Sequence, residues 1–225
     1  MSEDRLFIGT RRYSSWSLRG WLAVRLAGLD VKEVLIPLKG GFTHQIGAVS
    51  PNGMVPCLRH AGVLIWDSLA IGEYCAELAA ESGRHLWPAD RALRAQARAV
   101  ACEMHSGFRE LRIAMPMNLG REFPGPEGEG RRTPTALADI ARVEAIWSGC
   151  LAGHGGPFLF GAAFTLADAM FAPVCARFLT WQPELTRRSQ DYVAAVRAHP
   201  LVAEWYDAAA REPAEWLLDK YENPA

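Results

Sequence analysis

The sequence has almost no net charge and no long apolar run, and each absence removes a class of protein. Its formal net charge is −1, from 24 Lys and Arg against 25 Asp and Glu. Nucleic-acid binding needs clustered positive charge, so we expect no nucleic-acid partner. No apolar run reaches the ~18–20 residues of a membrane span. The N-terminal MSEDRLFIG has no basic region followed by an apolar one, so we expect neither a membrane anchor nor a signal peptide.

Cysteine is also scarce and unpatterned. The five cysteines are odd in number and scattered, with no CxxC pair and no Cys/His spacing typical of zinc. We therefore expect small core residues in a reducing compartment, with no disulfide framework and no metal, and we place the protein in the cytoplasm. The missing CxxC also argues against a redox protein of the thioredoxin type.

The first eighty residues alternate strand and helix signals. Helical spacing of apolar residues starts at Leu18, and Ala61–Gly62 reads as a hairpin turn. The predicted elements are a strand at 5–9, a helix from 18, a strand at 31–38, a short helix at 43–49, strands at 55–60 and 63–66, and a helix at 67–83. This β-α-β-α-β-β-α order predicts a thioredoxin-like α/β domain over residues 1–82.

The second half carries helical signals alone. After a linker at 83–91, residues 92–225 are predicted to form an all-α domain. The expected helices lie at 91–119, 134–152, 166–178, 184–197 and 201–211. The Pro- and Gly-rich REFPGPEGEGRRTP between the first two is expected to be an exposed loop. Thr165 and Asp168 are spaced as a capping box, which is a folding device and not a catalytic pair.

Three serines crowd the start of the first helix in RRYSSWSLRGWLAV (11–24). A helix start needs one capping side chain, and Ser14, Ser15 and Ser17 exceed that need. Either the surplus is accidental or this helix start binds something besides itself.

Two further motifs lie in the first half. Val55–Pro56 stands at the entry to a predicted strand, where proline fits because it lacks a ladder donor. In a thioredoxin-like layer we expect a cis bond here, turning the N–H and C=O of Val55 outward toward an extended peptide. Asp67 and Ser68 open the helix at 67–83. They could be an ordinary capping pair, or Asp67 could take an ammonium while Ser68 and the helix N-terminus hold a carboxylate.

Together these motifs resemble the cytosolic glutathione transferases, over essentially the whole chain. YSSWSLR is similar to the Ser-Ser-Cys-x-x-Arg motif of the zeta class, and most similar to bacterial proteins that carry YSSWSLR itself. MVP and DSLAIGEY resemble the family's glutathione-binding elements, and TLAD its helical-domain box. The resemblance implies a glutathione transferase acting in detoxification, with glutathione as co-substrate and a homodimeric assembly. It implies a glutathione site at Ser14, Ser15, Val55, Pro56, Asp67 and Ser68.

The sequence departs from the family pattern at two places. Trp16 stands where the zeta-like motif has Cys, which removes the nucleophile for disulfide chemistry and weakens the case for zeta-type isomerisation. Related classes carry His or Lys after Gly-Gly to meet the glycine carboxylate of glutathione, but this chain has Gly41, Phe42 and Thr43. We assign that role to His44, after a small shift.

A serine suits the chemistry that the resemblance implies. A free thiol with a pKa of ~8.5 is mostly protonated at neutral pH, and lowering its pKa by about two units takes roughly 2.7 kcal/mol. One hydroxyl donor could supply about 1.5–3 kcal/mol, and the helix dipole about 0.3–1 kcal/mol. Ser14 is the first choice for the donor, Ser15 the alternative and Tyr13 a rival. Ser17 is expected to face its own helix backbone, and Arg19 either supports the site or pairs with a carboxylate.

The electrophile is expected to meet the first helix of the all-α domain. His105, Arg109 and Arg112 would share a face there, which would favour an anionic substrate unless the face is merely solvated. Trp16 and Phe108 complete this predicted pocket. The alternatives to conjugation are a glutathione-dependent isomerase or dehalogenase, or a binding module without turnover.

Overall fold

The computed structural model describes residues 3–39 and 43–223. The chain forms two compact units. One comprises Met1–Leu86 and Glu204–Ala225, and the other comprises Trp87–Ala203. The predicted fold class is confirmed: a thioredoxin-like α/β layer comes first and an all-helical region follows.

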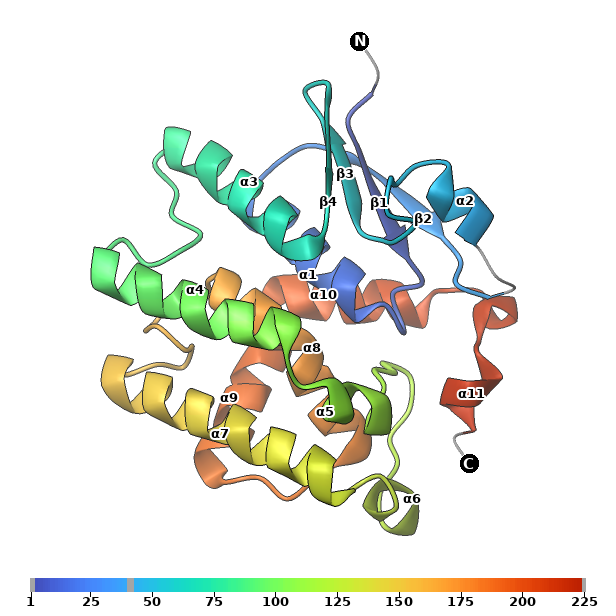
Figure 1. The fold of residues 1–225 in the computed structure, drawn as a ribbon, viewed down its shortest axis with the longest axis vertical. Coiled ribbons are helices and arrows are strands. Elements are labelled where there is room, and N and C mark those ends of the chain that lie inside the picture. Colours follow the sequence, from blue (N-terminus) through green and yellow to red (C-terminus); the bar gives the residue numbers. More distant parts are fainter. Residues whose placement is uncertain (1–2, 40–42, 224–225) are drawn as a thin grey trace. The chain divides into compact units, whose positions relative to one another are not determined.

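The first unit is built on a four-stranded mixed sheet (Figure 1). Its strands are β1 (Arg5–Gly9), β2 (Lys32–Ile36), β3 (Cys57–His60) and β4 (Val63–Trp66), in the order β2-β1-β3-β4. β1 and β2 are parallel, and the other two pairs are antiparallel. The helices are α1 (Ser15–Ala27), α2 (Thr43–Gly47) and α3 (Ser68–Glu81). The predicted order of strands and helices is therefore confirmed.

The two faces of this sheet carry separate apolar layers. Phe7, Ile36, Cys57 and Ile46 of α2 form one buried cluster. Alternate residues of a strand point to opposite faces. The fully buried Leu6, Ile8 and Leu58 therefore face the other way, toward the side on which α1 and α3 pack together (Figure 1).

The C-terminal segment from Glu204 belongs to the sheet-containing unit, whereas the helical signals predict one all-α domain over 92–225. The unit boundary falls inside α10 (Pro200–Ala210), which is followed by the 3-10 turn η1 (Ala214–Trp216) and by α11 (Asp219–Glu222). The ring of Trp205 lies 5.3 Å from that of Trp21 on α1. Its indole N–H also donates to the main-chain oxygen of Arg11 at 3.2 Å. These non-local contacts are invisible to local periodicity.

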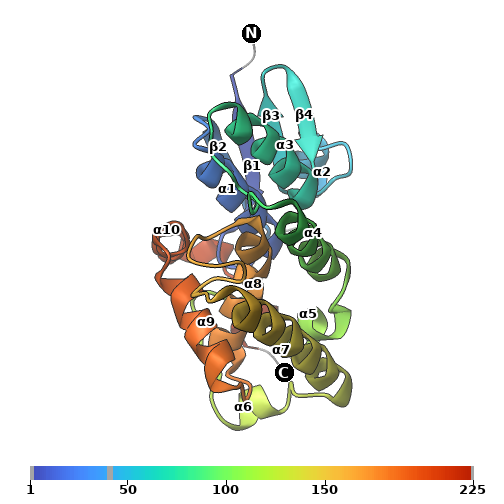
Figure 2. The same ribbon diagram turned by 90° about the vertical axis from the view of Figure 1, so that its left-hand side faces the viewer.

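The second unit is a helical bundle around one apolar helix (Figure 2). Its helices are α4 (Arg91–Ser106), α5 (Arg109–Ala114), α6 (Pro126–Glu129), α7 (Pro134–His154), α8 (Leu166–Trp181) and α9 (Arg187–Ala198). Nearly every residue of α8 is buried. The predicted capping box is confirmed, since Asp168 accepts from the N–H of Thr165 at 2.8 Å. Asp168 also accepts from the Tyr192 hydroxyl at 3.1 Å, so it joins α8 to α9.

Two predicted elements of this unit are wrong in detail. The helix expected over 91–119 breaks after Ser106, because Phe108 adopts a left-handed conformation with φ 59°. The segment expected to be only loop contains the short α6, which starts at Pro126. Within the described residues, no helix is both long and apolar enough to cross a membrane.

Candidate active site at the start of α1

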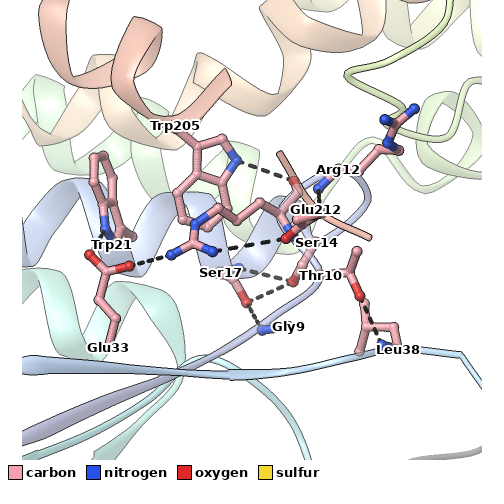
Figure 3. Close-up of polar contacts among 11 residues, drawn as sticks. Gly9, Thr10, Arg12, Ser14, Ser17, Trp21, Glu33, Leu38, Trp205 and Glu212 are labelled. Carbon is pink, nitrogen blue, oxygen red and sulfur yellow. Dashed lines mark hydrogen bonds and ion pairs between the residues drawn. The ribbon is translucent and has the colours of Figure 1, made fainter. Parts of the chain in front are cut away.

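The loop between β1 and α1 brings the serines to the end of the first strand. Ser14 is the N-cap of α1, and its hydroxyl oxygen accepts from the N–H of Ser17 at 3.3 Å. The hydroxyl hydrogen of Ser14 is directed to Ser17 Oγ at 2.7 Å (Figure 3). The cap therefore uses the oxygen of Ser14, while its proton is held by a neutral acceptor.

Ser17 has a different role from the expected one. It was expected to face its own helix, but its hydroxyl oxygen accepts from the N–H of Gly9 at 2.9 Å (Figure 3). Gly9 is the last residue of β1, and this bond lies in the interior. Ser17 thus joins the end of the strand to the first turn of the helix.

Ser15, Trp16 and Arg19 form the rest of the motif. Ser15 is the first residue of α1 and its side chain is buried. Arg19 is only 1% exposed, and its guanidinium carbon lies 4.9 Å from the centre of the Trp16 ring. Trp16 is 37% exposed, so a half-exposed ring lies within cation–π distance of a buried positive charge.

Tyr13, the rival thiol donor, is engaged by the C-terminal segment. Its hydroxyl donates to Glu222 Oε1 at 2.5 Å and accepts from the N–H of Leu218 at 3.2 Å. Burial and the hydrogen bond to Glu222 raise the pKa of Tyr13 well above its usual range. These contacts use the hydroxyl for packing the C-terminal segment, so Tyr13 is not placed to serve a thiol.

The second motif meets the first at Gly20. The Val55–Pro56 peptide bond is cis, as predicted. A Cβ on Gly20 of α1 would lie 2.6 Å from Pro56 Cγ and 3.7 Å from Ile71 Cδ1 of α3. The absence of a side chain at Gly20 thus lets all three predicted glutathione elements meet: α1, the Pro56 turn and α3.

The third motif opens α3. Asp67 is the N-cap, and its Oδ1 accepts from the N–H groups of Leu69 at 2.8 Å and Ala70 at 3.3 Å. Its φ of 76° is unusual for a residue with a side chain, and such conformations cluster at functional sites. Ser68 is buried, and among residues 3–39 and 43–223 no hydrogen-bond partner is found for its hydroxyl. A buried hydroxyl without a partner is costly, and it marks Ser68 as a candidate ligand contact.

The expected glycine-carboxylate contact is only partly visible. Gly41 and Phe42 lie outside the described residues, as does the side chain of Thr43. His44 lies on α2 and is exposed. Its role toward glutathione stays a prediction.

The predicted electrophile residues of the helical unit do not share one helix face. His105 lies on α4, whereas Arg109 and Arg112 lie on α5, beyond the break at Phe108. The Arg109 side chain is 80% exposed and pairs with Glu110 at 2.8 Å.

Arg112 is turned back toward α4. Its guanidinium donates to the main-chain oxygens of Gly107 at 3.0 Å, of His105 at 3.3 Å and of Met104. Burial lowers the pKa of Arg112. The prediction that these three residues share one helix face is therefore wrong. Their contact with an anionic substrate stays a prediction, and helical spacing no longer supports it.

Comparison with known proteins identifies the family. Residues 13–78 match the glutathione S-transferase N-terminal domain, and residues 91–208 match its C-terminal domain. The chain belongs to the glutathione S-transferase family. The expectation of a glutathione transferase enzyme is thereby confirmed at the level of the family.

Individual proteins that resemble this family member include named transferases and isomerases. Glutathione S-transferase 3 of Zea mays is 28% identical over 189 residues, covering 83% of this chain and 81% of the relative. Maleylacetoacetate isomerase of Rattus norvegicus is 28% identical over 181 residues, covering 78% of each. A crystal structure of maleylacetoacetate isomerase from Anaeromyxobacter dehalogenans, with bound dicarboxyethyl glutathione and citrate, aligns with a TM-score of 0.64 and 27% identity. That alignment covers 94% of this chain and 93% of the other.

Sequence reasoning missed the acidic residues around the loop of this transferase. Glu33, Glu212 and Glu222 contact Arg11, Arg12 and Tyr13. Glu212 is 201 residues from Arg11 along the chain, so no local pattern could have joined them. Among the described residues, His, Cys, Asp and Glu form no group that could hold a metal ion.

Proposed function

We propose that the protein is a serine-type glutathione transferase of the zeta-like group that carries YSSWSLR. In this proposal the start of α1 stabilises the thiolate of bound glutathione for attack on a small electrophile. The observation that carries it is the buried Ser68 hydroxyl at the N-terminus of α3, which has no partner among the described residues.

Glutathione fits the chemistry of this helix start. Its γ-glutamyl end carries a carboxylate and an ammonium. A hydroxyl donor at the positive end of a helix favours a carboxylate, and an aspartate favours an ammonium. Ser68 and Asp67 supply these groups next to each other. Pro56 lies against α1 at Gly20, whereas Val55 packs against the buried cluster on the α2 side of the sheet. The main chain at Val55 and Pro56 would hold the peptide part, and His44 the glycine carboxylate.

The thiol would then lie toward Ser14 and Ser15. Ser14 holds its proton on Ser17 Oγ, which is a neutral acceptor. A thiolate is an anion and therefore a stronger acceptor, so the hydroxyl can turn to it while the Ser14 oxygen continues to cap α1. Ser14 remains the first choice for the donor and Ser15 the alternative. The serine donates a hydrogen bond and is not itself a nucleophile.

Glutathione-dependent isomerisation is the second candidate. The similarity to rat maleylacetoacetate isomerase and to its bacterial counterpart supports it. Trp16, in place of the motif's cysteine, weighs against an identical substrate site. Comparing a conjugation substrate with a cis-configured unsaturated diacid, which needs glutathione to isomerise, separates the two reactions. Dehalogenation and a binding role without turnover complete the alternatives.

The source, compartment and oligomeric state of the enzyme are proposed from the same resemblance. We propose a bacterial, cytoplasmic homodimer whose physiological role is detoxification of small electrophiles. Size-exclusion chromatography with light scattering tests the assembly.

Calorimetric titration with glutathione tests the proposed function. Ser68→Ala should weaken binding about 10- to 100-fold, the effect of losing one hydrogen bond to a charged group. Ser82→Ala is the matched control, because Ser82 lies at the other end of α3 and its hydroxyl donates to Ala79 O. Absence of binding by the unmodified protein would overturn the proposal.

A further inference from the structure

The loop that leads from β1 to the serines of α1 is only partly closed by its own hydrogen bonds. The N–H groups of Tyr13 and Ser14 donate back to Thr10 O, at 3.2 and 2.9 Å. The N–H groups of Arg11 and Arg12 have a different acceptor. Both donate to the carboxylate of Glu212, at 2.6 and 3.2 Å, one to each oxygen (Figure 3). One carboxylate thus holds two successive amides just ahead of the serines.

Further contacts fix both the main chain and the side chain of Arg11. Its main-chain oxygen accepts from the indole N–H of Trp205 at 3.2 Å. Its guanidinium donates to Glu33, whose other carboxylate oxygen accepts from the indole N–H of Trp21 at 2.6 Å. The guanidinium of Arg11 also lies 3.9 Å from Glu212. Figure 3 shows Trp21, Glu33, Trp205 and Glu212 in one view with the Ser14–Ser17 pair.

Glu212 is a buried carboxylate, which is an unusual side chain for a purely structural contact. Its side chain is 5% exposed, and burial raises its pKa despite the hydrogen bonds and charges of Arg11 and Arg12 that lower it. A buried carboxylate costs free energy that a neutral side chain would not. Among acceptors, however, a carboxylate is well suited to take two N–H donors at once without offering a donor of its own.

We propose that Glu212 is a positioning residue for the glutathione thiol. It fixes the backbone at Arg11 and Arg12, and thereby fixes where the hydroxyls of Ser14 and Ser15 point. This inference rests on the proposed function. It adds that the C-terminal segment, far from the serine motif in sequence, sets the strength of thiolate stabilisation.

The test is an ultraviolet titration of the thiol of bound glutathione in three proteins. They are the unmodified enzyme, Glu212→Gln and Glu204→Gln. Glutamine keeps the shape of Glu212 but offers one amide an N–H group in place of an acceptor. Glu204 is the matched control: it lies in the same C-terminal segment and pairs with Arg25 at 3.0 Å, away from the loop.

Glu212→Gln should raise the pKa of the bound thiol by about one unit, since one misdirected donor loses much of a charged hydrogen bond. Its affinity for S-methylglutathione, which has no thiol, should be unchanged. Glu204→Gln should match the unmodified enzyme in both measurements. A merely structural role would lower the melting temperature of Glu212→Gln without moving the thiol pKa, and that result would overturn the inference.

The possible results of the titration distinguish a failure of this inference from a failure of the proposed function. If the unmodified protein does not bind glutathione, the proposed function fails and the inference with it. If it binds and lowers the thiol pKa, but Glu212→Gln does the same, only the inference fails. Should Glu212→Gln not fold, Glu212→Asp decides, because its shorter side chain keeps the charge but cannot reach both amides. A raised thiol pKa in that variant supports the inference, and an unchanged one overturns it.

Discussion

Gly20 of α1 and Pro56 of the cis turn approach so closely that a Cβ on Gly20 would lie 2.6 Å from Pro56 Cγ. Real Cβ atoms do not tolerate this distance, so a side chain at Gly20 must move the turn. The same turn carries Val55, which we assign to glutathione. The Gly20–Pro56 contact therefore joins the packing of the first unit to the proposed ligand site.

Gly20→Ala should weaken glutathione binding and destabilise the protein by about 1–3 kcal/mol through overpacking. Gly149→Ala is the control, because Gly149 lies inside α7, toward its C-terminal end, and has nothing within 4 Å of its Cβ position. It should be neutral or stabilise by up to about 1 kcal/mol through helix propensity. Urea unfolding and calorimetry on both variants measure this. Equal behaviour of the two variants would contradict the packing argument.

The serines of the loop should differ in their effect on stability. Ser17→Ala leaves the buried N–H of Gly9 without its acceptor, which should cost about 1–3 kcal/mol. Ser14→Ala removes the N-cap and should cost about 0.5–2 kcal/mol. Ser14→Thr keeps a hydroxyl and should recover most of that loss. Chemical denaturation of the three variants ranks their free energies of unfolding. A Ser17→Ala protein as stable as the unmodified one would show that the N–H of Gly9 finds another acceptor.

Tyr13 should matter for stability and not for the thiol. Tyr13→Phe removes the hydroxyl that donates to Glu222, so the free energy of unfolding should fall by about 1.5–3 kcal/mol. The pKa of the bound thiol should stay the same. The measurement is a thiol titration beside a denaturation curve. If the thiol pKa rose in Tyr13→Phe, the tyrosine would replace the serines as donor.

Asp168 should act in folding alone. Its carboxylate accepts from Leu159, Thr165 and Tyr192 in the interior of the helical unit. Asp168→Ala should destabilise the protein by several kcal/mol, because each buried donor that it leaves without an acceptor costs about 1–3 kcal/mol. The fraction that remains folded should bind glutathione as the unmodified protein does. Binding stoichiometry corrected for the folded fraction tests this, and weaker intrinsic affinity would give Asp168 a role that the capping box does not explain.

Local patterns account for what the sequence could predict. The capping box needs only Thr165 and Asp168, and the order of strands and helices in the first unit follows from short apolar runs and turn residues. The cis bond at Pro56 was predicted from that order because proline at this strand entry has a known geometry in such a layer.

Non-local contacts account for what it could not predict. The pairing of Glu212 with the amides of Arg11 and Arg12 spans about the whole chain, and it moves the C-terminal segment to the first unit. The break at Phe108 was missed because its neighbours keep helical spacing on both sides. That break also undid the argument for one face shared by His105 and Arg112.

The central claim is that a serine at the start of α1 lowers the pKa of the glutathione thiol. The most direct test is the ultraviolet titration of bound glutathione in the unmodified enzyme, Ser14→Ala and Ser15→Ala. We predict a thiol pKa about two units below the free value of ~8.5 in the unmodified enzyme. One serine variant should return it most of the way to ~8.5 while still binding S-methylglutathione. A low thiol pKa that survives both substitutions would contradict the serine mechanism.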